Sequence, residues 1–276
     1  METNYESLFG LGDQTAVVTG GGGGLGSEMV RTLATAGAKV AVLTRRSETS
    51  RPVADAINTA GGRAMAVACD VTDKGALEQA RASIENELGP VDILVNAAGG
   101  NRPLATSMPD RSFFELDEAA VREVLDLNFM GTFLACQVFG QAMAERGRGS
   151  VINISSMAAL RPLTRVVAYG AAKAAVDNFT RWLAVHMARE HHPAIRVNAI
   201  APGFFLTEQN RYLLTDHASG QMTPRGQSIL DHTPAARLGN ATDLAGVLLW
   251  LAGPSASFVT GTVIPVDGGF AAFGGV

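Results

Sequence analysis

Apolar and polar residues are arranged in two different patterns along the chain. Seven short, almost wholly apolar runs are typical of strands buried on both faces; they span residues 14–19, 39–43, 64–68, 91–95, 150–154, 194–200 and 262–266. Longer segments between them repeat apolar residues every three or four positions, as amphipathic helices do; they span residues 25–36, 47–60, 73–88, 117–146 (one helix or two), 167–189 and 242–251. This alternation predicts an α/β fold, a doubly wound parallel sheet of about seven strands with helices on both faces.

Nothing along the chain has the composition of a linker between domains. There is no low-complexity segment and no internal repeat, and 47% of the 276 residues are hydrophobic, which is enough for one large core. We therefore expect a single domain over residues 1–276. Residues 204–234 are the least regular part, with many turn residues and few strand signals. Such a stretch in a compact domain is typical of a functional lid, here over a substrate.

A glycine-rich segment follows the first predicted strand. The strand leads into TGGGGGLGS and then directly into a helix, with Gly20, Gly24 and Gly26 at a TGxxxGxG spacing. Such a loop lets the backbone approach a pyrophosphate and places a helix N-terminus beside it. Five consecutive glycines also occur in flexible linkers. Because a linker would not stand between an apolar strand and an amphipathic helix, we prefer the cofactor-binding interpretation.

Three residues with complementary chemistry follow the fifth predicted strand. Tyr169 and Lys173 lie four apart in a predicted helix and share one face, and Ser156 precedes them near the strand end. A free phenol has a pKa of roughly 10, and a nearby ammonium lowers that pKa. With Ser156 polarising the substrate oxygen, the set predicts a proton-relay site that interconverts an alcohol and a carbonyl. Taken alone, the Tyr and Lys spacing is more often an ordinary helix pair.

These motifs occur with others in an order that resembles the short-chain dehydrogenase/reductase family. The match covers about residues 11–269 and consists of TG(x)3GxG, Asn96-Ala97-Ala98-Gly99, Asn128, Ser156, Tyr169, Lys173, and Pro202-Gly203 with Thr207. The resemblance implies a Rossmann-type fold, a nicotinamide cofactor and oxidoreductase activity.

The resemblance also implies roles for single residues. Tyr169 is expected to act as general acid and base, Lys173 to lower its pKa and hold the nicotinamide ribose, and Ser156 to orient the substrate. Asn128 is expected to hold a water that links Lys173 to solvent. The expected cofactor contacts are Gly20, Gly24, Leu25, Gly26, Asp70, Val71, Asn96, Ala97, Gly99, Tyr169, Lys173, Pro202, Gly203, Phe205 and Thr207.

The end of the second predicted strand bears on the choice between NAD and NADP. An acidic residue there would bind the ribose 2′-hydroxyl and repel a 2′-phosphate. Thr44 occupies that place here and is followed by Arg45 and Arg46. Because a hydroxyl and a guanidinium both bind phosphate, we expect NADP(H) to be preferred, with NAD(H) as the alternative. A solvated turn with two surface arginines would also explain the pattern.

Several polar and basic residues are expected near the catalytic residues. The candidates for substrate binding are Asn101, Arg102, Arg161, Arg165, Gln209, Asn210 and Arg211. Any one arginine is more often a surface residue, but several together favour an anionic substrate because guanidinium pairs with carboxylate through two bonds. Amide groups nearby suit the hydroxyls of a sugar chain.

Short segments of the chain resemble a narrower group, the D-mannonate oxidoreductases (fructuronate reductases) of the short-chain type. These segments are GGNRP, RPLTR, PGFFLTEQNR, TPRGQ and VIPVDGGFAAF. The resemblance implies that D-mannonate and D-fructuronate are interconverted. Gluconate 5-dehydrogenases and 3-oxoacyl-carrier-protein reductases share the same core motifs and remain alternatives. A nucleotide-binding sensor without catalysis would have lost Ser156, Tyr169 or Lys173, and all three are present.

Charge and cysteine content exclude other classes of protein. The formal net charge is −4, and no apolar run approaches the roughly 20 residues of a membrane span, so neither nucleic acid nor membrane is an expected partner. The two cysteines, Cys69 and Cys136, lack metal-ligand spacing and are expected in the core of a cytoplasmic protein. We expect no metal site. By resemblance, we expect a dimer or tetramer formed through the long helices near residues 129–144 and 172–188.

Overall fold

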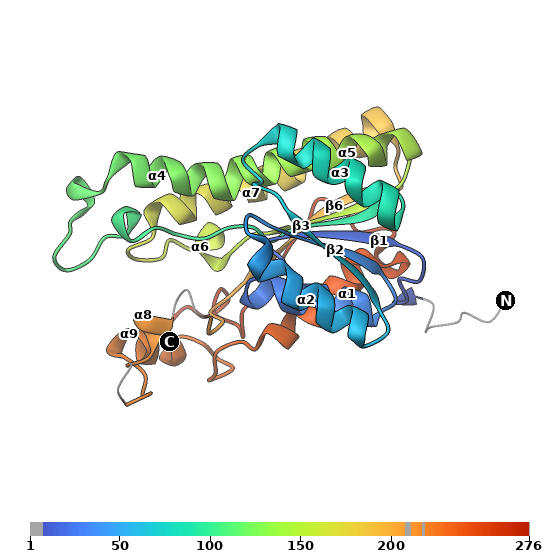
Figure 1. The fold of residues 1–276 in the computed structure, drawn as a ribbon. Coiled ribbons are helices and arrows are strands. Elements are labelled where there is room, and N and C mark those ends of the chain that lie inside the picture. Colours follow the sequence, from blue (N-terminus) through green and yellow to red (C-terminus); the bar gives the residue numbers. More distant parts are fainter. Residues whose placement is uncertain (1–7, 208–210, 217–218, 276) are drawn as a thin grey trace.

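A computed structural model describes residues 8–207, 211–216 and 219–275. In these residues the strands are β1 (Thr15–Thr19), β2 (Lys39–Thr44), β3 (Arg63–Ala68), β4 (Val91–Asn96), β5 (Gly149–Ile154), β6 (Ile195–Pro202) and β7 (Val263–Val266). They pair in parallel in the order β3-β2-β1-β4-β5-β6-β7 (Figure 1). The predicted doubly wound parallel sheet, with all seven strands, is confirmed.

Helices cover both faces of this sheet. In Figure 1, α1 (Gly24–Thr35) and α2 (Ser47–Thr59) lie below it, and α3 (Lys74–Leu88), α4 (Glu118–Leu125), α5 (Gly131–Arg146) and α7 (Val167–His186) lie above it. The lower cluster of buried side chains includes Met29, Leu33 and, from α10 (Ala245–Ala252), Leu248. The upper cluster includes Leu77 and Phe139. Helices α1, α3, α5 and α10 therefore bury apolar side chains against the sheet.

Two of the predicted helices contain a wider turn. The helix predicted over residues 117–146 is α4 and α5 joined by a π-helical turn at Asp126–Met130, and α7 ends in another at Met187–His191. Residues 242–251 begin with a 3₁₀ turn, and a short helix α6 (Met157–Leu160) follows β5. A 3.6-residue pattern does not distinguish an i→i+5 hydrogen bond from an i→i+4 one.

Residues 204–234 are more regular than predicted. They contain α8 (Arg211–Leu214) and α9 (Pro224–Asp231). Thr223 caps α9 by accepting from the Gly226 N–H, and its hydroxyl donates to the Leu213 carbonyl at 2.7 Å, which ties the two helices together. Figure 1 shows the C-terminal end of the chain beside this pair. The lid role and the single domain stay predictions.

The exposed residues give one indication of a partner, an apolar face on α7. On α7, Trp182 and Val185 are 57% and 59% exposed, an apolar face of the kind that a second copy covers, and the dimer or tetramer stays a prediction. No helix in the described part of the chain is long and apolar enough to cross a membrane.

Cys69 and Cys136 are buried and unpaired, as predicted, and burial raises the pKa of the Cys136 thiol to about 12.

Candidate active site

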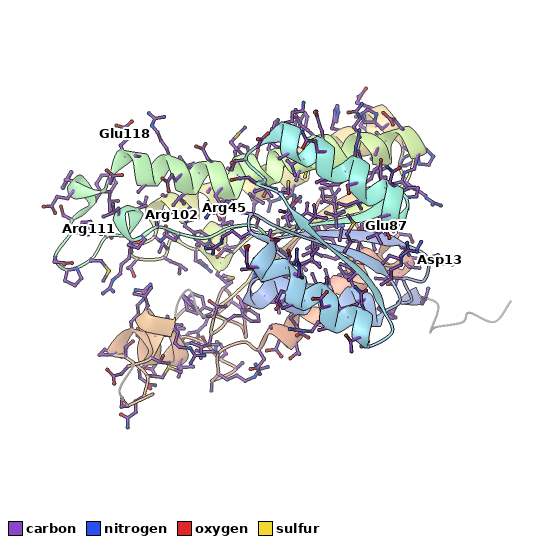
Figure 2. All side chains as sticks on the ribbon, in the orientation of Figure 1. Asp13, Arg45, Glu87, Arg102, Arg111 and Glu118 are labelled. Atoms are coloured by element: carbon purple, nitrogen blue, oxygen red, sulfur yellow. The ribbon has the colours of Figure 1, made fainter. Side chains whose placement is uncertain are left out.

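A cavity of about 1390 Å³ opens at the carboxyl ends of the strands, where the strand order reverses between β1 and β4. Figure 2 shows Arg45 and Arg102 on this side of the sheet, with Asp13 and Glu87 at the opposite end. The predicted residues that line the cavity are Gly20, Gly24, Leu25, Gly26, Thr44, Arg45, Arg46, Asp70, Val71, Ala97, Gly99, Asn101, Arg102, Ser156, Tyr169, Lys173, Pro202, Gly203, Phe205 and Thr207.

The glycine loop packs against its neighbours so closely that side chains would not fit. Gly20 has a φ of +68°, and a Cβ there would lie 2.8 Å from the backbone of Ala98. A Cβ on Gly26 would lie 2.2 Å from the Gly20 carbonyl oxygen. Gly24 differs, because its nearest neighbour is a methyl of Thr207 at 3.7 Å. The loop therefore presents bare backbone to the cavity at the start of α1, as a phosphate cradle requires.

Two asparagines hold the loop after β4 from behind the cavity wall. Asn96 donates to the Asn153 side chain at 2.9 Å, which links β4 to β5. Asn128, in the π-helical turn, accepts from the Gly100 N–H at 3.1 Å and donates to the Gly100 carbonyl at 2.7 Å. A Cβ on Gly99 would lie 2.6 Å from the Asn128 amide oxygen and 3.2 Å from Lys173 Nζ. Asn128 thus fixes the loop beside the lysine.

The predicted catalytic side chains meet at the end of β5. Lys173 is 3% exposed, donates to the Ile154 carbonyl at 2.7 Å, and lies 5.7 Å from the centre of the Tyr169 ring. Ser156 caps α6 by accepting from the Ala158 N–H at 3.2 Å. The structure therefore brings Ser156, Tyr169 and Lys173 together at one wall of the cavity.

Burial dominates the electrostatics of these groups. Burial raises the pKa of Tyr169 above its ordinary value, and a hydrogen bond with Ser156 opposes that rise. Burial also lowers the pKa of Lys173 to about 8, and the carboxylate of Asp177, one turn further along α7, opposes that shift. The structure differs here from the predicted lowering of the phenol pKa, because desolvation of Tyr169 outweighs the hydrogen bond with Ser156. Perturbed groups of this kind in a cleft are typical of catalytic sites.

The three residues predicted to bear on the choice between NAD and NADP lie at the end of β2 or directly after it. Thr44, Arg45 and Arg46 all line the cavity, and the Thr44 hydroxyl donates to the Arg46 carbonyl at 2.7 Å. The acid of this region follows β3: burial raises the pKa of Asp70, but hydrogen bonds from Thr72 and the charge of Arg45 lower it overall. Asp70 is therefore an anion beside Arg45.

Of the seven predicted substrate residues, two line the cavity, three do not, and two lie outside the described residues. Asn101 and Arg102 line the cavity, but Arg102 pairs with Glu123 at 2.9 Å. Arg161 instead donates to the Ala271 carbonyl at 2.9 Å, and Arg165 does not line the cavity and has its guanidinium 4.0 Å from the Met108 sulfur. Arg211 is exposed and does not line the cavity. Gln209 and Asn210 fall outside the described residues.

Sequence reasoning missed a cavity-lining arginine. Arg225, at the start of α9, lines the cavity and donates to the Thr164 side chain at 3.0 Å. The signal was present in the segment TPRGQ, but only the folding of α9 across the chain brings Arg225 to the site. Within the described ranges, no three His, Cys, Asp or Glu side chains gather as a metal site would require.

Comparison with known proteins gives consistent relatives. The family model described as short chain dehydrogenase matches residues 14–218. A Bacillus subtilis (strain 168) protein named uncharacterized oxidoreductase UxuB is 49% identical over 99% of both chains.

Two similar solved structures contain bound ligands. A Haemophilus influenzae protein proposed to be a D-mannonate oxidoreductase, with NAD bound, is 41% identical, has a TM-score of 0.92, and is matched over 99% of this chain and 100% of that one. A gluconate 5-dehydrogenase from Burkholderia cenocepacia J2315, in complex with NADP and tartrate, is 30% identical, has a TM-score of 0.86, and is matched over 97% and 99%.

The glycine loop offers a paired test of its packing. Gly26→Ala should lower the free energy of unfolding by about 1–3 kcal/mol, since the new methyl has no room beside the Gly20 carbonyl. Gly24→Ala should leave it near the wild-type value, because the methyl would meet only Thr207 at ordinary contact distance. Urea unfolding of both variants measures the difference; equal stabilities would contradict the geometry.

Proposed function

Because the chain belongs to the short-chain dehydrogenase family, we propose that it interconverts the secondary alcohol of a sugar acid and the corresponding ketone, with D-mannonate and D-fructuronate as the pair. It is an oxidoreductase of CH–OH groups, and the family uses NAD(P). The observation that carries the proposal is the meeting of Ser156, Tyr169 and Lys173 at the wall of a cavity that also contains a glycine cradle.

The cradle fits a dinucleotide. Gly20, Gly24 and Gly26 leave the backbone open to a pyrophosphate, and Thr207, which also lines the cavity, lies beside Gly24. When bound, a nicotinamide cofactor accepts a hydride from the alcohol carbon or returns it to the ketone.

Tyr169 and its neighbours handle the proton. In the oxidation direction, Ser156 and Tyr169 hold the substrate oxygen, and the phenolate of Tyr169 takes the hydroxyl proton as the carbonyl forms. In the reduction direction, the phenol returns the proton to that oxygen. The ammonium of Lys173 stabilises the phenolate within a desolvated site, where the electrostatic interaction is stronger than in water. Asn128 keeps the loop beside Lys173 in place.

A polar group at the cavity wall supports a polyhydroxy substrate. In the part of the chain that the structure describes, the amide oxygen of Asn101 is buried without a hydrogen-bond partner, while its nitrogen donates to Thr106 at 2.8 Å. Buried polar atoms are nearly always paired, so this unpaired acceptor, in a residue that lines the cavity, suits a donor on the ligand once the side chain turns toward it. A sugar hydroxyl supplies such a donor.

The first test is a nicotinamide absorbance assay with purified protein. D-mannonate, D-gluconate and D-mannitol would each be offered with NADP⁺ and NAD⁺. We expect turnover of D-mannonate in preference to the other two. Turnover confined to D-gluconate would move the proposal to a gluconate 5-dehydrogenase, and turnover confined to D-mannitol would exclude a sugar acid.

Tyr169→Phe tests the proton-transfer role. Losing the phenol oxygen should reduce kcat by on the order of 100- to 10,000-fold, as removal of a general acid–base group does. Cofactor affinity should stay close to that of the wild type, since the glycine cradle is unchanged; fluorescence titration with NADPH measures it. Turnover within a few-fold of the wild type would exclude Tyr169 as the acid and base.

Arg45→Glu tests a preference for NADP(H), which we propose because Thr44 and Arg45 line the cavity where an acid would select NAD(H). The substitution should lower the ratio of kcat/KM for NADP⁺ to that for NAD⁺ by about 10- to 100-fold. Arg51→Glu, on the exposed surface of α2, makes the same charge change away from the cavity and should leave the ratio unchanged. An unchanged ratio in Arg45→Glu would place the 2′-phosphate elsewhere.

A further inference from the structure

Arg225 connects α9 to the segment that joins α6 and α7. It is partly buried, lines the cavity, and donates to the Thr164 hydroxyl at 3.0 Å and to the Thr164 carbonyl at 3.5 Å. A guanidinium has five N–H donors in a planar fork, so these two bonds leave donors for a ligand. The joined segment runs from the helix that Ser156 caps to the helix that carries Tyr169.

A second arginine, Arg165, directly follows Thr164, the residue to which Arg225 donates. Burial and the positive charge of Arg165 together lower the pKa of Arg225 from its ordinary value. Among the residues that the structure describes, neither guanidinium forms an ion pair with a carboxylate. Two neighbouring, partly buried cations without a counter-ion are unfavourable, and a bound anion relieves both the desolvation and the repulsion.

The backbone of Arg165 is itself unusual. Its φ is +76°, a left-handed conformation that few residues other than glycine adopt. Its carbonyl accepts from the Ser107 N–H at 3.0 Å, and its guanidinium lies against Met108. One backbone hydrogen bond and one side-chain contact therefore tie Arg165 to the segment at Ser107 and Met108.

Two other arginines of this region already have hydrogen-bond or ion-pair partners, and a third does not line the cavity. Arg102 is paired with Glu123, and Arg161 binds the carbonyl of Ala271. Arg211, in α8, is exposed and away from the cavity wall. Arg225 is thus the cavity-lining arginine near the catalytic segment whose charge no described carboxylate neutralises.

We propose that Arg225, with Arg165 behind it, binds the carboxylate of the substrate and thereby selects a polyhydroxy carboxylate over the uncharged compound of the same length. The inference rests on the proposed function, since it takes the substrate to be a sugar acid. The planar fork of Arg225 matches the two oxygens of a carboxylate, which a lysine would not. Held at this end, the substrate extends along the cavity toward Tyr169, so the carboxylate site also orients the reacting carbon.

Arg225→Met and its matched control, Arg211→Met, test the site. With D-mannonate, Arg225→Met should raise KM or lower kcat/KM by on the order of 10- to 100-fold, the range for a lost hydrogen bond to a charged group. With D-mannonamide, which keeps every hydroxyl but lacks the charge, kcat/KM should change little. Arg211→Met should match the wild type on both compounds.

Arg225→Lys separates charge from geometry. It keeps the positive charge without the fork and should fall between the wild type and Arg225→Met in the ratio of kcat/KM for D-mannonate to that for D-mannonamide. An equal loss on both compounds in Arg225→Met would mean that Arg225 only supports the fold of α9, and would overturn the proposal. Wild-type kcat/KM for D-mannonate in that variant would overturn it as well.

Binding distinguishes failure of this site from failure of the proposed function. If the wild type does not turn over D-mannonate, the proposed function fails, and calorimetric titration with tartrate then tests the carboxylate site alone. Weaker tartrate binding by Arg225→Met than by the wild type and Arg211→Met would support the site. Equal binding by all three proteins, or none by the wild type, would overturn it.

Discussion

Strands β1 and β4 lie side by side at the centre of the sheet, and the chain leaves them toward opposite edges and opposite faces. From β1 it passes through α1, which buries Met29 and Leu33 on one face, and returns as β2. From β4 it passes through α4 and α5, which bury Phe139 on the other face, and returns as β5. Because the two connections diverge, a crevice forms at the carboxyl ends of the strands. The glycine loop, the loop after β4 and Ser156 all follow strand ends, so the topology gathers them at this crevice.

Desolvation then sets the chemistry of the crevice. Lys173 is almost fully buried, lines the cavity, and donates one hydrogen bond to the Ile154 carbonyl. Its position depends on its neighbours: Gly99 leaves no room for a side chain beside it, and Asn128 fixes the loop that carries Gly99. The π-helical turn places the Asn128 amide toward that loop, an irregularity of the kind often found at functional sites. Through Asn128, the π-helical turn therefore helps to position the loop beside Lys173, whose positive charge the proton transfer needs.

Elements whose apolar residues recur with a simple period can be predicted from the sequence, whereas features that depend on tertiary contacts cannot. The strands were predictable because burial on both faces leaves them almost wholly apolar. The glycine cradle and the Ser156, Tyr169 and Lys173 set were predictable because spacing along one helix or loop determines their proximity. The π-helical turn at Asn128 was not predictable, since a 3.6-residue pattern does not reveal an i→i+5 hydrogen bond. The raised pKa of Tyr169 was not predictable either, since it arises from burial in the folded chain. Arg225 was missed, and Arg161 proposed instead, for the same reason: their neighbours, Thr164 and Ala271, are 61 and 110 residues away.

Local charge, and not the net charge, decides which ligands the cavity favours. The chain carries a formal net charge of −4, so its overall field does not attract anions. Among the described residues, however, two of the three acids that line the cavity have partners: Glu123 pairs with Arg102, and Asp70 accepts from Thr72. Arg225 has no such partner among the described residues, and Arg45 lies at the end of β2 where the cavity meets the glycine loop. Two anionic groups at separate places along one cavity, a phosphate near Arg45 and a carboxylate near Arg225, would therefore set the direction in which cofactor and substrate lie relative to Tyr169.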